Sequence, residues 1–509
     1  MRETEYDVEH LVNQAGPGAL RSPNWPVWSG FLLCVYIAIS LIGWKRTLID
    51  TEIWAVFHAS RSFPDLVVAV RDDLVHPPLM YLIEWSWIRA FGNADTSLKV
   101  LALLVNIPSF FLFTRLLSQL TPHWRVGSLL FFNFYFRIGN TPNQVRMYGL
   151  GLLLTITAMV LWEKWRRAPH NKFLLGWLLV AVLLVYTHLF GLLILTGFVA
   201  ANWIKGPRRW TFAAAAAVVA LAVMPWYLYA LPVYESRGLA DNLTWVPRKI
   251  HIGLGMLSYG LLGEFSGSIP LRIALAATAG AVNLFFFILV LRTGRSLWPP
   301  RTSVAPGTHW FWVATCLLAV PLLLDLLFAL AVRPALHWRF VLGILPAYWM
   351  LLVLVAERNG RSGRILLYGI VLPWVLTNTA VSFVSGNIVA PARQAAYIIA
   401  GHHDSGDLLL AENLSIGNQL YWEWNHRLGR QGRIEVLTPP AAVARLSVLP
   451  PTDFEHLDLQ GVDRVWFYCI TATAAKDARS AMAAYRFRLR KEFPLEHPFL
   501  LLFVREELP

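Results

Sequence analysis

Up to residue 385, hydrophobic residues form long runs that short polar connections separate. A helix that crosses a membrane needs about 20 mainly apolar residues. Runs of this kind predict about eleven spanning helices, at residues 27–44, 97–118, 126–140, 148–165, 173–189, 190–204, 211–231, 270–292, 309–332, 339–356 and 364–385. The pattern therefore predicts a transmembrane domain over residues 27–385.

Residues 77–91 are apolar and helical in pattern but too short to cross a membrane. At 1.5 Å per residue the segment is about 22 Å long, whereas the hydrocarbon core is about 30 Å thick. Trp85 and Trp87 are residues typical of the membrane–water interface. We therefore expect an interfacial helix here, within a first outer loop that covers residues 45–96.

The hydrophobic pattern changes after residue 385, where charged residues return. Buried strands are predicted at 408–413, 434–437, 462–470 and 499–504, and helices at 391–402 and 472–486. Strands that alternate with helices favour a small α/β domain. We expect this domain to cover residues 386–509.

Composition supports the membrane interpretation. Of 509 residues, 56% are hydrophobic and only 15% are charged, against roughly 25% charged in an ordinary soluble domain. The net charge of +13 would suggest nucleic-acid binding in a soluble protein. Because much of it lies in short connections between apolar runs, it indicates membrane topology and no nucleic-acid partner. The predicted class is a polytopic α-helical membrane protein.

Lys and Arg gather in five of the short connections. These lie at residues 115–125, 164–172, 205–209, 292–301 and 358–364. Connections rich in Lys and Arg stay in the cytoplasm. Residues 1–26 are then a cytoplasmic tail, and the loop 45–96 and the domain 386–509 face outward.

The first outer loop contains acidic residues and a histidine within a short stretch: Asp50, Glu52, Asp72, Asp73 and His76. A carboxylate among them is a candidate general base, or with His76 a ligand for a divalent cation. The alternative is a solvated acidic loop without a catalytic role. His76 precedes Pro77 and Pro78, which suit the first turn of a helix.

Three further polar clusters lie at predicted outer boundaries. Arg146 and Tyr148 belong to one, His188 to the second, and Arg333, His337 and Arg339 to the third. An arginine there can bind a lipid phosphate with its planar guanidinium, or can extend to the interface with no binding role. A lone histidine such as His188 is more often structural. Because all three clusters and the acidic loop face one compartment, a site is favoured.

Asp325 lies inside an apolar run. It suits either a proton relay of a transporter or a hydrogen bond within the helical bundle. No phosphate-binding GxxxxGK[ST] loop, HExxH, CxxC or GxSxG motif occurs in the sequence.

Several motifs, in their order and spacing, resemble those of the bacterial GT-C glycosyltransferases, closest to the protein-mannosyltransferase-like and aminoarabinose-transferase-like branch. They are Asp50, HPPLMYLIEWSWIRAFG (76–92), QVRMY (144–148), YTHLFGLL (186–193) and HWRFVLGILPAYWMLL (337–352). The resemblance covers most of residues 27–509. It implies a GT-C fold in a bacterial cytoplasmic (inner) membrane, with a small C-terminal α/β domain on the outer side.

The resemblance also implies an activity, which is inverting transfer of a sugar from a polyprenyl-phosphate donor to a glycan, glycolipid or protein acceptor at the outer face. Asp50 would be the general base that deprotonates the acceptor hydroxyl. Arg146, His188 and Arg339 would contact the donor phosphate, and Asp73 and His76 would line the cleft. Tyr148 and His337 are further candidates for substrate binding.

The sequence departs from the family pattern at two places. The adjacent Asp-Glu pair of many relatives is here Asp50-Thr51-Glu52, so Glu52 is a second candidate carboxylate. The Asp that often stands two residues before the histidine is here Leu74, with Asp73 one position earlier. These departures leave the role of Asp73 open, together with the need for a divalent cation such as Mg or Mn.

Two other functions fit the same sequence. A transporter or flippase of lipid-linked sugars would depend on Asp325 and on broken helices, and would show inverted repeats. A non-catalytic membrane scaffold would tolerate loss of Asp50 and Arg146.

Overall fold

The computed structural model describes residues 24–42, 48, 50–73, 76–137, 144–206, 208–237, 254, 269–297, 306–331, 342–377, 391–412, 414–428, 433–437, 451–452, 454, 457–469, 472–493 and 499–506. The chain divides into two compact units. The first comprises Met1–Ile42, Phe63–Ile83 and Leu98–Ser385, and the second comprises Gly43–Ser62, Glu84–Ser97 and Gly386–Pro509. Residues of the first outer loop thus belong to both units.

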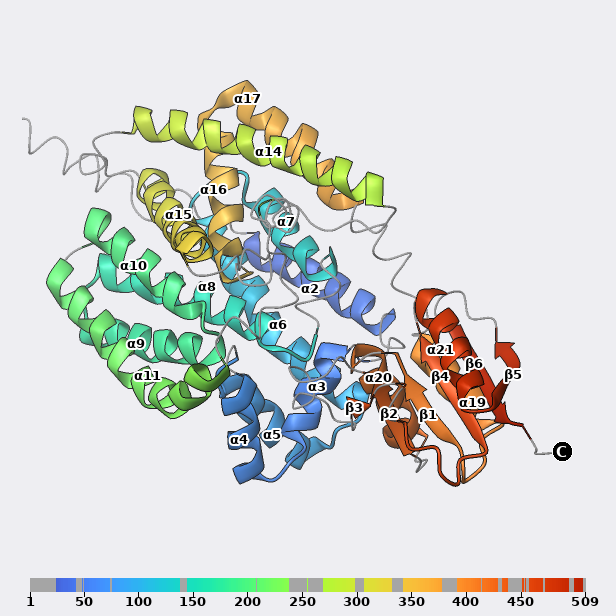
Figure 1. The fold of residues 1–509 in the computed structure, drawn as a ribbon. Helices are drawn as coiled ribbons and strands as arrows, with labels where there is room; N and C mark the ends of the chain where they lie inside the picture. Colours follow the sequence, from blue (N-terminus) through green and yellow to red (C-terminus); the bar gives the residue numbers. More distant parts are fainter. Residues whose placement is uncertain are drawn as a thin grey trace, which may run out of the picture. The chain divides into compact units, whose positions relative to one another are not determined.

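The first unit is an assembly of helices (Figure 1). Its helices are α2 (Trp25–Ile42), α4 (Phe63–Asp73), the start of α5 (Leu79–Phe91), α6 (Asp95–Ser118) from Leu98 on, α7 (Trp124–Arg137), α8 (Met147–Arg167), α9 (Asn171–Thr187), α10 (Gly191–Lys205), α11 (Arg209–Arg237), α14 (Ile269–Ser296), α15 (Pro306–Ala331), the 3₁₀ turn η3 (Leu342–Ile344), α16 (Leu345–Arg358), α17 (Gly360–Arg364) and the π-helical segment η4 (Ile365–Val371).

Each predicted span contains a helix in the described residues, although the adjoining ends of the spans 173–189 and 190–204 lie in the turn between α9 and α10. Within the described residues, four helices are long and apolar enough to cross a membrane: Asp95–Ser118, Arg209–Glu235, Ile273–Ser296 and Gly307–Ala331. Shorter apolar helices occur at Trp25–Ala38, Asn171–Thr187 and Gly191–Ile204. The mostly helical, apolar architecture is confirmed, while the number of crossings stays a prediction.

The outer boundary predicted at His188 lies in a turn at residues 188–190, between α9, which ends at Thr187, and α10, which begins at Gly191. One predicted boundary was wrong. Helix α11 runs on to Arg237, beyond the expected end at residue 231, although Pro225 and Pro232 lie inside it. Neighbouring helices and local adjustments allow proline inside membrane helices.

Helix α16 forms the centre of the first unit. All of its residues from Leu345 to Ala356 are buried. It contacts α7, α8, α14 and α15. A helix that is hydrophobic on all sides, as the segment LPAYWMLLVLVA is, is typical of a protein core or of a membrane span.

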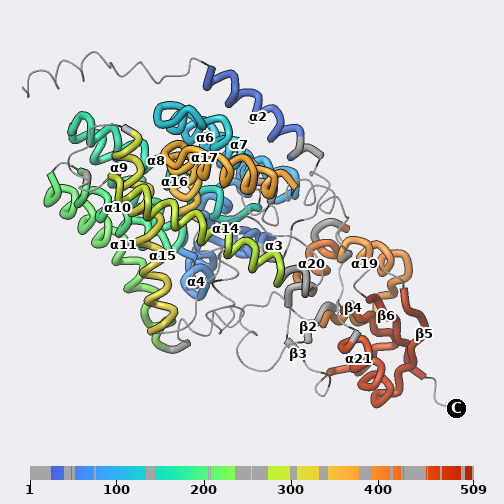
Figure 2. The backbone as a smooth tube through the Cα atoms, turned by 90° about the horizontal axis from the view of Figure 1, so that it is seen from above, coloured from blue at the N-terminus to red at the C-terminus, as the bar shows by residue number. Residues whose placement is uncertain are grey.

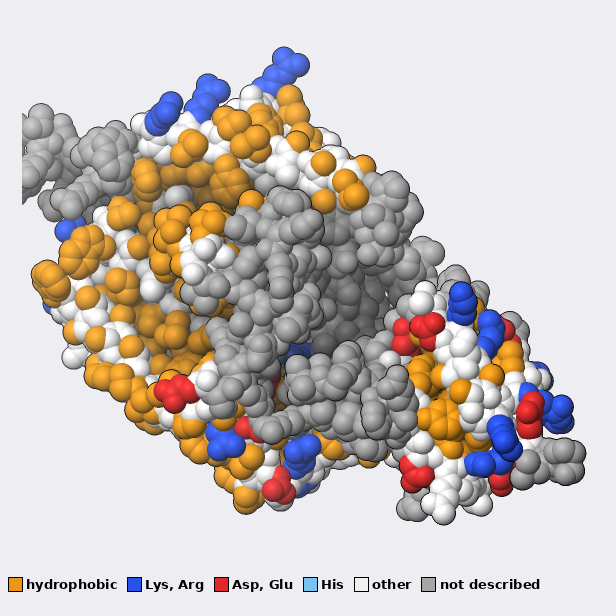
Figure 3. All heavy atoms as spheres, in the orientation of Figure 1, with side chains coloured by type: hydrophobic (Ala, Val, Ile, Leu, Met, Phe, Trp, Pro, Cys, Tyr) orange, Lys and Arg blue, Asp and Glu red, His pale blue; other side chains and the backbone are white. Residues whose placement is uncertain are grey.

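The outer surface of the same unit is also apolar. Large hydrophobic side chains stand exposed along α11, where Leu221, Met224 and Leu228 follow at helical spacing. Leu284, Ile288 and Leu291 do the same along α14. The space-filling view shows hydrophobic side chains over much of the visible face of these helices (Figure 3). Such a surface suits lipid as its solvent.

The second unit contains a sheet with helices on both faces (Figures 1 and 2). Its strands are β1 (Leu408–Ala411), β2 (Arg433–Leu437), β3 (Pro451–Thr452), β4 (Arg464–Cys469), β5 (Phe487–Phe493) and β6 (Phe499–Arg505), in the order β3-β2-β1-β4-β6-β5. Strands β3, β2, β1 and β4 are parallel, and β6 and β5 add on antiparallel. The predicted C-terminal α/β fold is present.

Alternation along the strands creates the two layers of core. In β4, Trp466 and Tyr468 pack with α19 (Pro391–Ala400) on one face, while Val465 and Phe467 pack with α21 (Ala472–Ala484) on the other. Successive strand side chains point to opposite faces. Three elements were not predicted: β3, β5 and α20 (Leu414–Tyr421), which continues into the π-helical η5 (Trp422–Arg427). Strand β5 escaped prediction because only its terminal phenylalanines are buried.

Helix α3 (Asp50–Ala59) belongs to this second unit, where it contacts α20. The rings of Phe57 and Tyr421 meet edge to face, with centroids 6.5 Å apart. Asp95 accepts a 3.0 Å hydrogen bond from the Trp422 indole. Arg393 on α19 lies 3.8 Å from the Asp95 carboxylate and 3.2 Å from that of Glu423. These contacts attach α3 and the end of the first outer loop to the sheet domain.

Candidate functional site

A hydrogen-bonded group of polar side chains lies where α4 ends and α5 begins. Asp73 is the last residue of α4 and is buried. Nδ1 of His76 lies 2.9 and 3.0 Å from its two carboxylate oxygens. The Tyr81 hydroxyl on α5 donates a 2.6 Å hydrogen bond to Oδ2 of the same carboxylate. Asp73 therefore holds the imidazole of His76 in one orientation.

Two residues from distant segments complete the group. Arg146, at the N-cap of α8, is 6% exposed, and its Nη2 lies 3.5 Å from Nε2 of His76. The rings of His76 and His188 meet edge to face, with centroids 5.4 Å apart. Asp73, His76, Arg146 and His188 were all predicted from the sequence, and the first unit brings them together. We call these four residues the Arg146 cluster.

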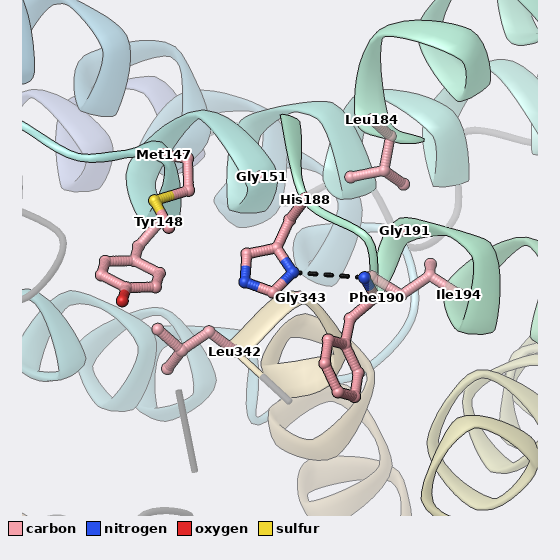
Figure 4. A pocket seen from close by; sticks show the side chains of 10 residues that line it. All are labelled: Met147, Tyr148, Gly151, Leu184, His188, Phe190, Gly191, Ile194, Leu342 and Gly343. Atoms are coloured by element: carbon pink, nitrogen blue, oxygen red, sulfur yellow. Dashed lines mark hydrogen bonds between the residues drawn. The ribbon is translucent and has the colours of Figure 1, made fainter. Parts of the chain in front are cut away.

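His188 occupies the turn between α9 and α10 and lines a cavity of about 30 Å³ together with Tyr148 (Figure 4). The backbone N–H of Phe190 donates a 3.2 Å hydrogen bond to Nδ1 of His188. A ring nitrogen that accepts a hydrogen bond carries no proton, so the neutral ring has its proton on Nε2. The turn is tight, because a Cβ at Gly191 would lie 2.7 Å from the Leu184 carbonyl oxygen.

The same surroundings set the pKa of His188. Burial, and then the neighbouring charges of His76 and Arg146, lower it well below its ordinary value, and the nearby Asp73 only partly opposes them. His188 is therefore neutral at pH 7 and presents an N–H donor at Nε2. Figure 4 shows this nitrogen on the side of the ring that faces Tyr148.

The pKa of Asp73 is lowered, whereas the pKa of a buried acid without partners is raised. Burial raises it, but the charge and hydrogen bond of His76, the hydrogen bond of Tyr81 and the charge of Arg146 together lower it below its ordinary value. Asp73 is therefore a carboxylate at neutral pH, and a poor proton acceptor.

This shift predicts a pH dependence of stability. The ionised Asp73 stabilises the fold fully above its ordinary pKa of 3.8, and this contribution is lost as the pH falls through the lower folded-state pKa. We expect the melting temperature of the wild type to exceed that of Asp73→Asn by a constant amount above about pH 5, and by less below about pH 4. Thermal unfolding in detergent at stepped pH measures both.

Tyr81→Phe is the matched variant, because it removes one hydrogen bond from the Asp73 carboxylate and keeps its charge. Its loss of stability on acidification should begin at the same pH as in the wild type, because the pKa in the unfolded chain is unchanged, but should be smaller and end at a higher pH. A stability difference between wild type and Asp73→Asn that grows towards acid pH would contradict the lowered pKa.

The remaining predicted residues lie elsewhere or outside the described residues. Asp50 is the first residue of α3, and its side chain is outside the described part of the chain. Glu52, also on α3, is fully buried within the second unit. Asp72 pairs with Arg71 at 3.2 Å. Arg333, His337 and Arg339 lie outside the described residues.

Sequence reasoning missed Tyr81, although it lies in the HPPLMY motif. The position of Tyr81 within an apolar helix gave no reason to expect its hydroxyl to contact Asp73. Sequence reasoning placed His188 at a helix boundary, but it did not reveal that a backbone N–H, rather than a side chain, sets the His188 tautomer. Only the packing of the helices reveals either contact.

The described residues contain no group of three or more His, Cys, Asp or Glu side chains that could hold a metal ion. Asp73 and His76 are the nearest to such a group, and they are hydrogen-bonded to each other. These residues do not by themselves fit a divalent cation, so no chemical step is assigned to one.

Neither a protein-family model nor a curated protein sequence matches the chain. Solved structures do. ArnT from Cupriavidus metallidurans bound to undecaprenyl phosphate matches with a TM-score of 0.54 and 12% identity, over 95% of this chain and 98% of ArnT. The apo state of the same protein matches with a TM-score of 0.53 and 12% identity, over 92% and 97% of the two chains.

The Archaeoglobus fulgidus oligosaccharyltransferase is a more distant structure, with a TM-score of 0.45 and 10% identity over 92% of this chain and 72% of that one. The match to ArnT covers nearly the whole of both chains, so this chain has the fold of ArnT, in keeping with the fold that the resemblance in sequence implied. At 12% identity the match shows the fold and leaves the activity to be argued from the site.

Proposed function

We propose that this protein transfers a sugar from a polyprenyl-phosphate donor to an acceptor hydroxyl at the outer face of the bacterial cytoplasmic membrane, with inversion at the anomeric carbon. The observation that carries the proposal is the Arg146 cluster, in which a buried arginine and two partly buried histidines converge at the N-terminus of α8.

The cluster suits the phosphate of such a donor. Arg146 offers the planar guanidinium that matches phosphate oxygens, and it stands at the N-cap position of α8, whose N-terminal dipole favours anions. Neutral His188 adds an N–H donor, and His76, oriented by Asp73, directs Nε2 towards Arg146. Asp73 acts as a positioning residue in this scheme. Its lowered pKa argues against the role of general base.

Two bonds to the anomeric carbon change in the reaction, and one proton moves. The acceptor oxygen bonds to the anomeric carbon and gives its proton to the Asp50 carboxylate, with Glu52 as the second candidate base. The bond from the anomeric carbon to the phosphate oxygen breaks, and the polyprenyl phosphate leaves as an anion. Charge develops on this leaving group, where positive side chains lower the barrier most.

The lipid part of the donor is supported by the apolar surface of the helical unit and by the neighbour ArnT, whose solved structure holds undecaprenyl phosphate. A lipid-linked donor explains why a phosphate site occurs in a membrane protein. A glycolipid, a polysaccharide and a protein hydroxyl all fit as acceptor class, with the loop 45–96 and the domain 386–509 on the acceptor side.

Sugar transfer by the purified protein tests the proposal directly. Wild-type protein in nanodiscs is incubated with radiolabelled polyprenyl-phosphate sugars and an extract of membrane lipids. We expect a labelled product from at least one donor, and inhibition by added undecaprenyl phosphate because it would be the leaving group. If undecaprenyl phosphate neither binds nor inhibits, the phosphate site is refuted, whichever sugars the donors carry.

A transporter of lipid-linked sugars is the second candidate, because Asp325 on α15 is fully buried in an apolar helix. Among the described residues, neither of its carboxylate oxygens has a hydrogen-bond partner. A transporter would require this carboxylate, whereas the transferase proposed above makes no use of it.

Asp325→Leu separates the two functions. A buried polar group without a partner costs roughly 1–3 kcal/mol, so we expect the leucine variant to melt at higher temperature and to transfer sugar at the wild-type rate. Asp325→Asn, which stays polar, should melt near the wild type. Loss of function in both variants, with the fold intact, would favour the transporter.

A further inference from the structure

An open groove of about 270 Å³ lies between the end of α14 and the start of α15. Val290, Leu291 and Arg295 line it from α14, and Phe311 and Trp312 line it from α15. None of these residues belongs to the Arg146 cluster. The groove is therefore separate from the site of the proposed reaction.

The groove is apolar along its length and cationic at one end. Leu291 and Arg295 are one helical turn apart, so both lie on the same face of α14. From Val290 to Arg295 the helix rises about 7.5 Å. Leu291 is 65% exposed, and Phe311 is buried beneath the groove. Arg295 lies in the last turn of α14, where its guanidinium is exposed.

Positive charge gathers at the same end of the helices. Arg292 lies exposed one turn before Arg295. Arg358 donates a 2.8 Å hydrogen bond to Thr308 Oγ1, and Asn359 donates one of 2.8 Å to Thr293 Oγ1, so the end of α16 lies against both α14 and α15. In the described part of the chain, Arg295 forms no ion pair with a carboxylate. Figure 3 shows Lys and Arg side chains along the edge where α14 and α17 lie.

We propose that this groove binds one anionic glycerophospholipid of the surrounding membrane, with its phosphate at Arg295 and the first carbons of an acyl chain between Leu291 and Phe311. An apolar groove that ends in an exposed arginine complements both parts of such a lipid. Trp312 suits the level of the headgroups. The site does not depend on the proposed sugar transfer.

Native mass spectrometry of delipidated protein in detergent tests the site with three probes: phosphatidylglycerol, phosphatidylcholine and inorganic phosphate. We expect the wild type to retain one phosphatidylglycerol with at least about fivefold preference over phosphatidylcholine. Arg295→Gln should lose this preference. Inorganic phosphate should not bind at the concentrations that saturate the lipid, because it lacks the acyl chain.

Two further variants keep the test specific. Arg292→Gln removes an equal charge from the same helix without touching the groove, and should retain the lipid. Gly294→Leu fills the groove and keeps Arg295. A Cβ at this position meets only ring atoms of Trp312 and Phe311 at 3.7–3.9 Å, so the fold should tolerate it. The melting temperature without lipid checks the fold of every variant.

The expected results are loss of phosphatidylglycerol in Arg295→Gln and in Gly294→Leu, with retention in Arg292→Gln. Equal loss of phosphatidylglycerol in Arg295→Gln and Arg292→Gln would show that the overall positive charge of this end attracts the lipid, and would overturn the proposal. Equal binding of phosphatidylglycerol and phosphatidylcholine by the wild type would also overturn it, as would binding of inorganic phosphate in place of the lipid.

Discussion

Replacing Asp50 by asparagine is expected to lower the rate of sugar transfer about 10³-fold, within the 10²–10⁴-fold range that general bases contribute. The asparagine side chain cannot accept the proton of the acceptor hydroxyl, so the acceptor attacks as a poor nucleophile. The effect should fall on kcat, with little change in KM for the lipid donor. Initial rates of transfer at varied donor concentration measure both constants.

Glu52→Gln is the matched control for this experiment. Glu52 lies on the same helix α3 and is fully buried. If Asp50 is the base, Glu52→Gln should retain most of the transfer activity once its melting temperature shows an intact fold. Full activity in Asp50→Asn together with loss in Glu52→Gln would transfer the role of base to Glu52.

Replacing Arg146 by glutamine is expected to lower kcat/KM about 10²–10³-fold, the cost typical of removing one group that stabilises developing charge. Arg146 is buried beside His76, where a charge is screened less by water than at the surface. Its loss should also weaken binding of undecaprenyl phosphate. The transfer assay and a binding titration with that lipid measure the two effects separately.

Arg71→Gln provides the control for a lost arginine near the same site. Arg71 precedes Asp73 by two residues on α4, but its guanidinium pairs with Asp72 and lies over the Tyr229 ring at 5.3 Å. We expect less than about a threefold change, because exposed pairs of this kind contribute little. Equal losses in Arg71→Gln and Arg146→Gln would mean that general charge, rather than Arg146 itself, binds the donor.

Much of the architecture followed from the sequence because the length of an apolar run limits what it can form. Each predicted span contains a helix in the described residues, and the four strands predicted in the tail are all present. Strand β5 was missed because it contains no apolar run. The charged residues between Phe487 and Phe493 face solvent at the edge of the sheet.

The candidate residues also followed from the sequence, but their roles did not. Asp73 was a candidate base in the sequence, and the structure places His76 and Tyr81 on its carboxylate, where they lower its pKa. Nothing in the pattern of the chain brings Tyr81 to Asp73 or the Phe190 backbone N–H to His188. Such contacts depend on the turn between two helices, which hydrophobicity does not encode.

By itself, therefore, the sequence determined the class of this protein, its helical segments and its sheet domain. The spacing of apolar residues along a segment indicates which of its faces are buried, and this distinguishes helices from strands. The tertiary structure decided which polar residues meet: it joined α4, α5, α8 and the turn after α9 around Arg146, and it attached α3 to the sheet domain. Contacts between distant segments arise from helix packing and a few directional hydrogen bonds, and these form only when the chain has folded.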